Sequence, residues 1–291
     1  ATQAAAGQIV TTGWTLPADT QTLTVTATLR DAAGNTTPTA TDSAKLDLVT
    51  PNNSNAVTLE IVRDLNNDGT INAAEKGAFT STDLKASFDK TKVAVGDVLT
   101  LSDGVTTKTL TVTATDLSQG YVTSTGWTLP ADGGTLTVTA TLQDAAGNTT
   151  PTAQDVAKLD TTTPNNNQAL GLKIDIDNAP DNGYTTAAEK NGVTTTSLTA
   201  TFDGTQAAVG DIITFTVGST TQDVVITQND IDAGKVTSTG WALPANGATM
   251  TATAVLKDAA GNAVPQATDT AVMSFASNTT ATIDILSISA D

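Results

Sequence analysis

The feature that most limits how this chain can fold is a long internal repeat. The segment TTGWTLPADTQTLTVTATLRDAAGNTTPTA begins at Thr11, returns almost unchanged from Ser124, and occurs in a looser form from Ser238. Its tryptophan recurs about every 113 residues, which is too long for one turn of a solenoid and suits one whole domain. The sequence therefore predicts a row of similar domains.

Within each repeat, apolar residues alternate with threonine and other polar residues, which is the pattern of half-buried β-strands. The strands predicted for the second repeat, labelled A to G in order, cover roughly 57–63, 82–88, 97–102, 107–114, 120–127, 135–143 and 153–159. About seven short antiparallel strands without a long helix are typical of an immunoglobulin-like β-sandwich. We therefore expect an all-β protein built of tandem immunoglobulin-like β-sandwiches in a linear array.

The repeat period also predicts domain boundaries. Residues 51–163 and 164–277 should each form one complete immunoglobulin-like repeat. Residues 1–50 match only strands E to G of a repeat, and residues 278–291 match a linker and the first strand of a following repeat. We therefore expect the chain to be a segment of a longer array.

Composition excludes several classes of function. The chain has 13 basic and 30 acidic residues, a net charge of −17, which disfavours nucleic acid and anionic membranes and suits divalent cations. It has no cysteine and no histidine, so disulfides, zinc sites of the usual kind and Ser-His-Asp triads are ruled out. No apolar run is long enough to insert into a membrane. Carboxylate pairs could serve a glycosidase, but the aspartates recur at turns in every repeat, so we expect no enzyme.

One acidic segment of the second repeat, DLNNDGTINAAE, matches the twelve-place calcium loop of EF-hands. Gly69 would make the turn at place 6, and the residues at the ligand places are Asp64, Asn66, Asp68, Thr70, Asn72 and Glu75. A hard cation needs six or more oxygens around it, which this spacing supplies. Because the loop follows a strand, we expect an EF-like loop inserted in the sandwich; the alternative is a solvated acidic loop.

The third repeat carries an altered copy of this loop, DIDNAPDNGYTTAAE. Counted from Asp177 to Glu189, it is one residue longer than the loop from Asp64 to Glu75, and the apolar eighth place is taken by Thr185. Its oxygen-bearing residues could still surround a cation, and the candidates are Asp175, Asp177, Asp181, Asn182 and Glu189.

A second kind of calcium site is predicted where repeats meet. In an immunoglobulin-like sandwich, the B–C and F–G loops face the preceding repeat, and strand G ends beside the following one. The carboxylate and amide residues thereby brought together are Asp47 with Asp89, Asp144 and Asn148, and Asp160 with Asp203, Asp258 and Asn262. Converging carboxylates repel unless a cation bridges them. Alternatively, the DAAGN segments are turns held by their own Asp and Asn side chains, and both interpretations can hold together.

Aromatic residues are scarce, and the three tryptophans end strand E of their repeats. Trp14, Trp127 and Trp241 could stack on sugars, but a large residue sealing the core beside the LP of the E–F loop is the simpler interpretation.

The recurring GW(T/A)LP, TLTVTAT, DAAGN and LD-x-x-TP segments resemble the bacterial immunoglobulin-like repeats of giant type I-secreted adhesins and biofilm-associated proteins. The resemblance covers nearly the whole chain. It implies a secreted, bacterial cell-surface protein that folds on meeting Ca²⁺ and acts as a calcium-stiffened stalk in cell adhesion, biofilm formation or virulence. Its partners would be calcium ions, neighbouring repeats and, through other parts of the protein, a host-cell or abiotic surface. The alternative is a ligand-binding module of such a protein that grips a carbohydrate or protein.

Overall fold

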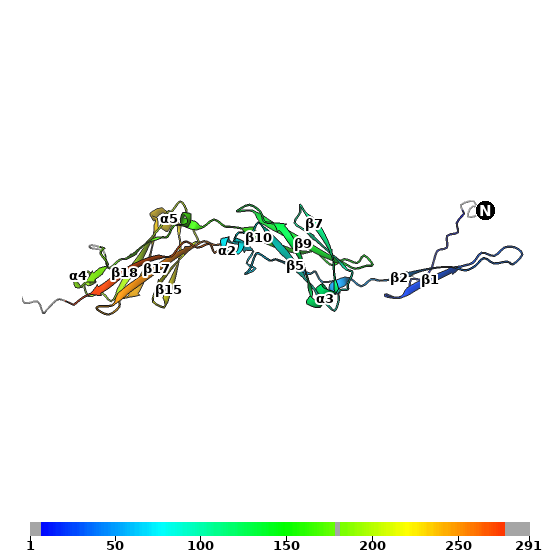
Figure 1. Ribbon diagram of the computed structural model, residues 1–291, viewed down its shortest axis with the longest axis horizontal. Coiled ribbons are helices and arrows are strands. Elements are labelled where there is room, and N and C mark those ends of the chain that lie inside the picture. Colours follow the sequence, from blue (N-terminus) through cyan, green and yellow to red (C-terminus); the bar gives the residue numbers. More distant parts are fainter. Residues whose placement is uncertain (1–6, 178–180, 277–291) are drawn as a thin grey trace, which may run out of the picture. The chain divides into compact units, whose positions relative to one another are not determined.

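The computed structural model describes residues 7–177 and 181–276 (Figure 1). Strands form most of its regular structure, and its helices are one or two turns long. The predicted linker and outgoing strand at 278–291 lie outside the described residues.

The second repeat consists of two sheets. One is antiparallel, in the order β3 (Thr58–Ile61), β5 (Ser81–Ser87), β8 (Tyr121–Thr128). The other has the order β4 (Thr70–Ile71), β10 (Ala153–Leu159), β9 (Thr135–Gln143), β6 (Val98–Ser102), β7 (Thr107–Thr111). Every second side chain of β5 is buried, because successive side chains of a strand point to opposite faces. The predicted all-β sandwich is confirmed.

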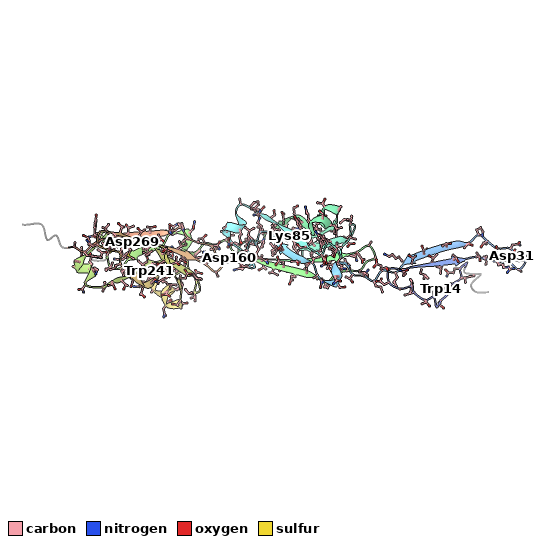
Figure 2. The ribbon with its side chains drawn as sticks, turned by 90° about the horizontal axis from the view of Figure 1, so that it is seen from below. Trp14, Asp31, Lys85, Asp160, Trp241 and Asp269 are labelled. Atoms are coloured by element: carbon pink, nitrogen blue, oxygen red, sulfur yellow. The ribbon has the colours of Figure 1, made fainter. Side chains whose placement is uncertain are left out.

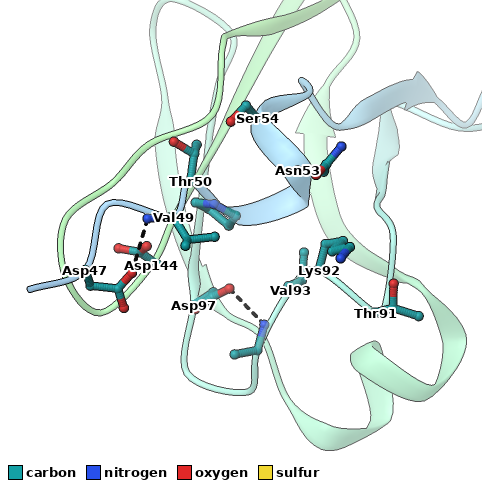
Figure 3. Close-up of a pocket in the computed structure, with 12 residues that line it drawn as sticks. Asp47, Val49, Thr50, Asn53, Ser54, Thr91, Lys92, Val93, Asp97 and Asp144 are labelled. Atoms are coloured by element: carbon teal, nitrogen blue, oxygen red, sulfur yellow. Dashed lines mark hydrogen bonds between the residues drawn. The ribbon is translucent and has the colours of Figure 1, made fainter. Parts of the chain in front are cut away.

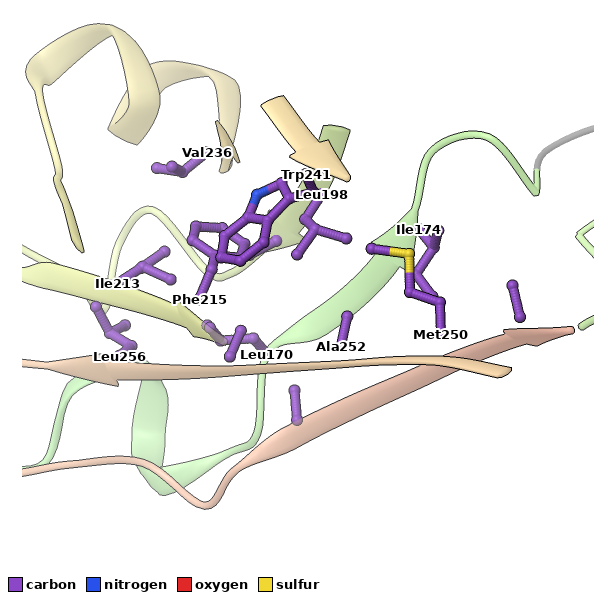
Figure 4. Packing of buried hydrophobic residues seen from close by; sticks show 14 of the residues in the cluster. Leu170, Ile174, Leu198, Ile213, Phe215, Val236, Trp241, Met250, Ala252 and Leu256 are labelled. Carbon is purple, nitrogen blue, oxygen red and sulfur yellow. The ribbon is translucent and has the colours of Figure 1, made fainter. Parts of the chain in front are cut away.

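The third repeat has the same plan. Its smaller sheet has the order β11 (Gly171–Ile174), β13 (Thr195–Thr201), β16 (Lys235–Ala242). Its larger sheet has the order β12 (Tyr184–Thr186), β18 (Ala267–Ser274), β17 (Thr249–Lys257), β14 (Ile212–Val217), β15 (Thr220–Val225). Phe215, Trp241 and Met250 pack in the core with Leu, Ile, Val and Ala side chains (Figure 4). Aliphatic residues thus build most of the core.

The predicted first strand contains β3, which pairs with β5, whereas the short strand β4 was not predicted. β4 follows the turn of the acidic loop and pairs in parallel with β10 of the other sheet, so that β3 and β4 form two halves of strand A. At the point of division, Asp155 on β10 accepts a hydrogen bond from the backbone N–H of Ile61, with an N···O distance of 2.7 Å. Asp269 holds Ile174 in the same way in the third repeat, also at 2.7 Å. Each acidic loop is therefore an insertion between the two halves of strand A.

Within residues 7–177 and 181–276, four short helices occupy places where the sequence analysis predicts only strands and loops: α2 (Ala73–Lys76), α3 (Ala114–Gln119), α4 (Ala187–Lys190) and α5 (Gln228–Ala233). Each begins at a capping box. In α3, for example, Thr113 accepts from Asp116 N–H, and the Asp116 carboxylate accepts from Thr113 N–H. α3 and α5 join the fourth predicted strand to the fifth, and the fourth strand itself pairs with the third in the larger sheet.

The polar linkers that open the two complete repeats are ordered turns, η1 (Pro51–Ser54) and η2 (Pro164–Asn167). Asn52 is buried at positive φ, and its side chain donates to the carbonyls of Asn55 and Ala56 and accepts from Asp89 N–H. Asn165 does the equivalent with Gln168 and Asp203. Each linker is thereby fastened to the B–C loop of its own repeat.

The N-terminal segment forms a two-stranded antiparallel sheet of β1 (Thr22–Ala27) and β2 (Ala40–Lys45), which correspond to strands F and G. The predicted strand E around Trp14 is absent from the described residues; in the complete repeats that strand pairs with strand B, which has no counterpart here. Trp14 is 59% exposed, whereas Trp127 and Trp241 are 1% and 3% exposed, so core packing is confirmed for these two. Figure 2 marks Trp14 in the N-terminal segment and Trp241 in the third repeat.

The chain divides into two compact units. The first comprises Ala1–Asn67, Thr80–Leu129 and Thr135–Ala157, and the second comprises Asp68–Phe79, Pro130–Gly134 and Lys158–Asp291. The segment that carries α2 therefore groups with the third repeat. Boundaries at 51–163 and 164–277 follow the sequence period and stay a prediction.

Candidate calcium loops and repeat junctions

The acidic loop of the second repeat turns back between β3 and β4. Asn67 and Gly69 have positive φ values of 55° and 85°, which reverse the chain. The carboxylate of Asp68 accepts a hydrogen bond from Thr70 N–H at 2.8 Å. Asp64 and Glu75, at the first and last predicted ligand places, are buried. A strand precedes the loop, and a single helical turn forms its last part.

Helix α2 begins inside this loop. Asn72 is its N-cap, and its side-chain oxygen accepts from the N–H groups of Ala74 and Glu75, both at 3.0 Å. Glu75 Oε2 accepts in return from Asn72 N–H at 3.0 Å. The two residues at ligand places 9 and 12 thus also hold the helix, and one Glu75 oxygen already accepts a hydrogen bond.

In the third repeat, the corresponding loop is closed by Asp177. This carboxylate is 2% exposed and accepts from Asn182 N–H at 3.3 Å and from Gly183 N–H at 2.8 Å. It occupies the place that Asp64 has in the second repeat.

The other candidate ligands of that loop make separate contacts. Asp175 accepts from the Thr199 hydroxyl at 2.9 Å, and Asp181 lies 3.6 Å from the Lys173 ammonium. Glu189 accepts from the N–H of Thr186 at 2.8 Å, closing the cap of α4. Each of these three residues thus takes part in a hydrogen bond or ion pair, and a cation site in this loop stays a prediction.

At the first junction, three carboxylates line one pocket of about 440 Å³ (Figure 3). Asp47 follows strand G of the N-terminal segment, Asp144 belongs to the F–G loop, and Asp97 precedes β6. Asp89, which the sequence placed in this group, is outside the pocket lining, and its carboxylate accepts from the N–H and hydroxyl of Thr91.

Asp97 is a site residue that the sequence analysis missed. It is 4% exposed, and its Oδ2 accepts from Ala94 N–H at 2.9 Å. Burial raises the pKa of the Asp97 carboxyl, and the charge of Asp144 raises it further, although the bond from Ala94 acts the other way. Burial also acts to raise the pKa of Asp144, but hydrogen bonds from Asn148, Ala146 and Gly147 outweigh it and lower that pKa. The missed signal was the tripeptide VGD, which recurs at 95–97 and 209–211.

The second junction repeats this arrangement. Asp160, Asp211 and Asp258 line a pocket of about 410 Å³. Asp211 is 4% exposed, and burial raises its pKa, with further contributions from the charges of Asp258 and Asp160. Asp203 is again outside the lining, and its carboxylate accepts from the N–H and hydroxyl of Thr205.

The DAAGN segments are turns, as the simpler interpretation expects. Asp144 accepts from the backbone and side-chain N–H groups of Asn148, at 2.8 and 2.9 Å. The Asn148 side chain also contacts the incoming linker, because its Nδ2 lies 3.1 Å from the carbonyl oxygen of Asp47. Asn262 is bonded to Asp258 in the same way and donates to the carbonyl of Asp160 at 2.9 Å. Asn148 and Asn262 thus each stabilise the F–G turn of their own repeat and also contact the linker that enters it.

These sites can be tested against the needs of a calcium ion. Buried carboxylates, amide oxygens and carbonyls are the ligands that Ca²⁺ prefers, so the chemistry of the donors fits. Within the described ranges, however, no three acidic side chains lie close enough together to hold a metal ion as they stand. Binding would therefore require the carboxylates of a pocket to move closer together.

The fold and the repeated junctions define a class: tandem immunoglobulin-like β-sandwich repeats. Residues 50–161 match the family model of the bacterial Ig-like domain. The family is a structural, non-catalytic one, in agreement with the prediction that the chain is not an enzyme. No curated protein matches the sequence.

Several solved structures resemble the chain. A Ca²⁺-stabilized adhesin that helps an Antarctic bacterium bind ice has 23% identity and a TM-score of 0.35, over 88% of this chain and 57% of that one. A tetra-tandem repeat from the extending region of a large adhesion protein has 22% identity and a TM-score of 0.28, over 86% and 56%. The chain thus spans little more than half of these structures. In the parts of the chain that the structure describes, no helix has the length and apolar character to cross a membrane.

Proposed function

We propose that this chain is a calcium-stiffened extender segment of a large secreted bacterial surface adhesin that acts in cell adhesion or biofilm formation. The observation that carries the proposal is the recurrence of one three-carboxylate pocket at both repeat junctions, Asp47, Asp97 and Asp144 at the first and Asp160, Asp211 and Asp258 at the second. In this proposal, residues 51–163 and 164–277 are the repeats, and secretion by a type I system, display at the cell surface and a role in virulence follow from the family resemblance.

The pockets explain why a cation would stiffen the array. Each one takes a carboxylate from the end of one repeat and two from the next, one of them buried. A bound Ca²⁺ would supply positive charge that turns mutual repulsion of these carboxylates into attraction. Asn148 and Asn262 would keep the F–G turn against the linker, since they contact both.

The loop of residues 64–75 supports a further calcium site within the second repeat. Asp64, Asp68 and Glu75 would provide charged ligands, and the turn at Gly69 already has the positive φ that an EF-like loop needs. Since Glu75 Oε2 accepts from Asn72 N–H, Glu75 would have to share or release that bond to serve as a bidentate ligand. In the third repeat, we propose a weaker site, because Asp175 and Asp181 are bonded elsewhere.

Isothermal titration of the purified chain with CaCl₂ tests the proposal. We expect binding with a Kd of roughly 10⁻⁴–10⁻³ M, the range of extracellular calcium modules, and a weaker response to Mg²⁺. The variants Asp97→Asn and Asp211→Asn should each remove one junction site, and Glu75→Gln should weaken the loop site. Asp223→Asn is a matched control, because Asp223 is exposed on β15 and its carboxylate bonds the Thr214 hydroxyl. No calcium-dependent heat, or equal loss in the control, would refute the proposal.

A further inference from the structure

The helix that ends the acidic loop of the second repeat is bonded to the third repeat. Asn262 Oδ1 accepts from Ala73 N–H at 2.7 Å, and Asn262 Nδ2 donates to the carbonyl of Asp160 at 2.9 Å. These residues all belong to the second compact unit. Asn262 is 4% exposed, and a Cβ placed on its neighbour Gly261 would lie 3.4 Å from Asn72 Nδ2. The F–G turn of the third repeat is therefore packed on the first residues of α2.

Ala73 is the first residue of α2, and its neighbours are tied to the acidic loop. A helix leaves its first N–H groups without partners inside the helix. In α2, Asn72 accepts from the N–H groups of Ala74 and Glu75, whereas the N–H of Ala73 bonds to Asn262. Asn72 and Glu75, at ligand places 9 and 12, thus stabilise the first turn of α2. The first N–H of this turn bonds to the third repeat.

The first junction has only half of this arrangement. There, Asn148 donates to the carbonyls of Asp47 and Val49, at 3.1 and 3.4 Å. The described part of the N-terminal segment has no counterpart of α2, since the acidic loop lies between the two halves of strand A. The chain thus offers one junction with a helix contact and one without it.

We propose that α2 and Asn262 form a relay that couples the calcium state of the loop at residues 64–75 to the order of the second junction. A ligand that rearranges Asn72 and Glu75 changes the position of the Ala73 N–H and hence its bond to Asn262. By thermodynamic reciprocity, docking of Asn262 favours one state of the loop. The identity of the ligand as Ca²⁺ rests on the proposed function, whereas the bond between α2 and Asn262 does not.

Ala73→Pro is a selective test of the relay. Proline removes the N–H that bonds to Asn262 and puts a ring carbon in its place, so this hydrogen bond cannot form. Proline is well tolerated at the first helical position, and Asn72 already has the extended backbone that the residue before proline needs (φ −83°, ψ 178°). Ala187→Pro, at the first position of α4, is the matched control. Because the chain has no cysteine, Val105→Cys and Val225→Cys, at residues 95% and 55% exposed, give one spin-label pair across the second junction.

In calcium, Glu75→Gln should broaden the distance distribution of this pair, and in the Ala73→Pro background it should cause no further broadening. Ala73→Pro should also weaken calcium binding by the loop about 5-fold, the scale of a coupling near 1 kcal/mol. Ala187→Pro should leave both readouts unchanged. Equal broadening by Glu75→Gln in both backgrounds would overturn the relay.

The relay and the proposed function fail in different ways. Absence of calcium heat in the unaltered chain would overturn the calcium loop, not the contact between α2 and Asn262. In EDTA, Ala73→Pro should still broaden the distribution relative to Ala187→Pro. Identical distributions for these two variants in EDTA, whatever the calcium result, would overturn the relay.

Discussion

Single residues show where two repeats of the same fold differ. Thr185 in the third repeat takes the place of Ile71 in the second, and both are 0% exposed. The Thr185 hydroxyl has no hydrogen-bond partner among the described residues, which costs about 1–3 kcal/mol for a buried polar group. Thr185→Val should therefore stabilise the third repeat by about 1–2 kcal/mol in urea unfolding. A lower unfolding midpoint for this variant would contradict the account, and Ile71→Thr, which should destabilise the second repeat, is the reciprocal control.

Asp97 combines a stability cost with a proposed function. Its carboxyl is buried beside Asp144, and its pKa is raised because the charged form is disfavoured there. In EDTA at neutral pH, Asp97→Asn should raise the melting temperature of the second repeat, because it removes a buried charge. In millimolar calcium the unaltered chain should have the higher melting temperature of the two, since only it gains the binding energy of calcium at this junction. Calorimetry in the two buffers checks this, and a variant less stable in EDTA would contradict it.

Among the elements, the η1 turn shows that the linker belongs to the repeat it precedes. Asn52 places both donors of its amide on the carbonyls of Asn55 and Ala56 inside a buried pocket. Asn52→Asp replaces these donors with acceptors and should destabilise the second repeat by about 2 kcal/mol. Asn53→Asp is the control at the same positive φ, because Asn53 is exposed. Equal unfolding midpoints for the two variants in urea would show that the turn is not held in this way.

The exit of the second repeat is held by Asp132. Its carboxylate accepts from Thr161 N–H at 2.5 Å and from the Thr161 and Thr162 hydroxyls at 2.7 and 2.6 Å. The hydrogen bonds from Thr162 and Thr161 lower its pKa below the ordinary value of 3.8. Because the folded pKa is the lower one, this contact stabilises above pH 3.8 and is lost as pH falls through the folded pKa. The protection factor of the Thr161 amide, which corrects for the intrinsic pH dependence of exchange, should therefore fall below that pH, and unchanged protection at low pH would contradict the contact.

The same elements show what the sequence alone can predict. Alternation of apolar and polar residues locates the strands, because Leu84 and Leu136 must turn inward for their neighbours to reach water. It fails for β4, which is two residues long and pairs in parallel with a distant strand. The pattern also does not predict the burial of Asp97. A carboxylate before a strand is usually exposed, and only the tertiary packing buries this one. The clamp on Asn52 could not be predicted either, because it joins residues far apart in the sequence.

For the whole molecule, the central claim is that calcium stiffens the array through its junctions. With a net charge of −17 and carboxylate pockets at both junctions, neighbouring repeats should repel in the absence of a divalent ion. Filling the pockets should hold successive repeats in one orientation and make the chain longer and straighter.

Small-angle X-ray scattering of the full chain in millimolar calcium and in EDTA measures this most directly. The account predicts a larger maximum dimension and a rod-like distance distribution in calcium. It also predicts that the double variant Asp97→Asn, Asp211→Asn scatters alike in both buffers, whereas Asp223→Asn responds as the unaltered chain does. An unaltered chain with the same maximum dimension in calcium and in EDTA would contradict the claim.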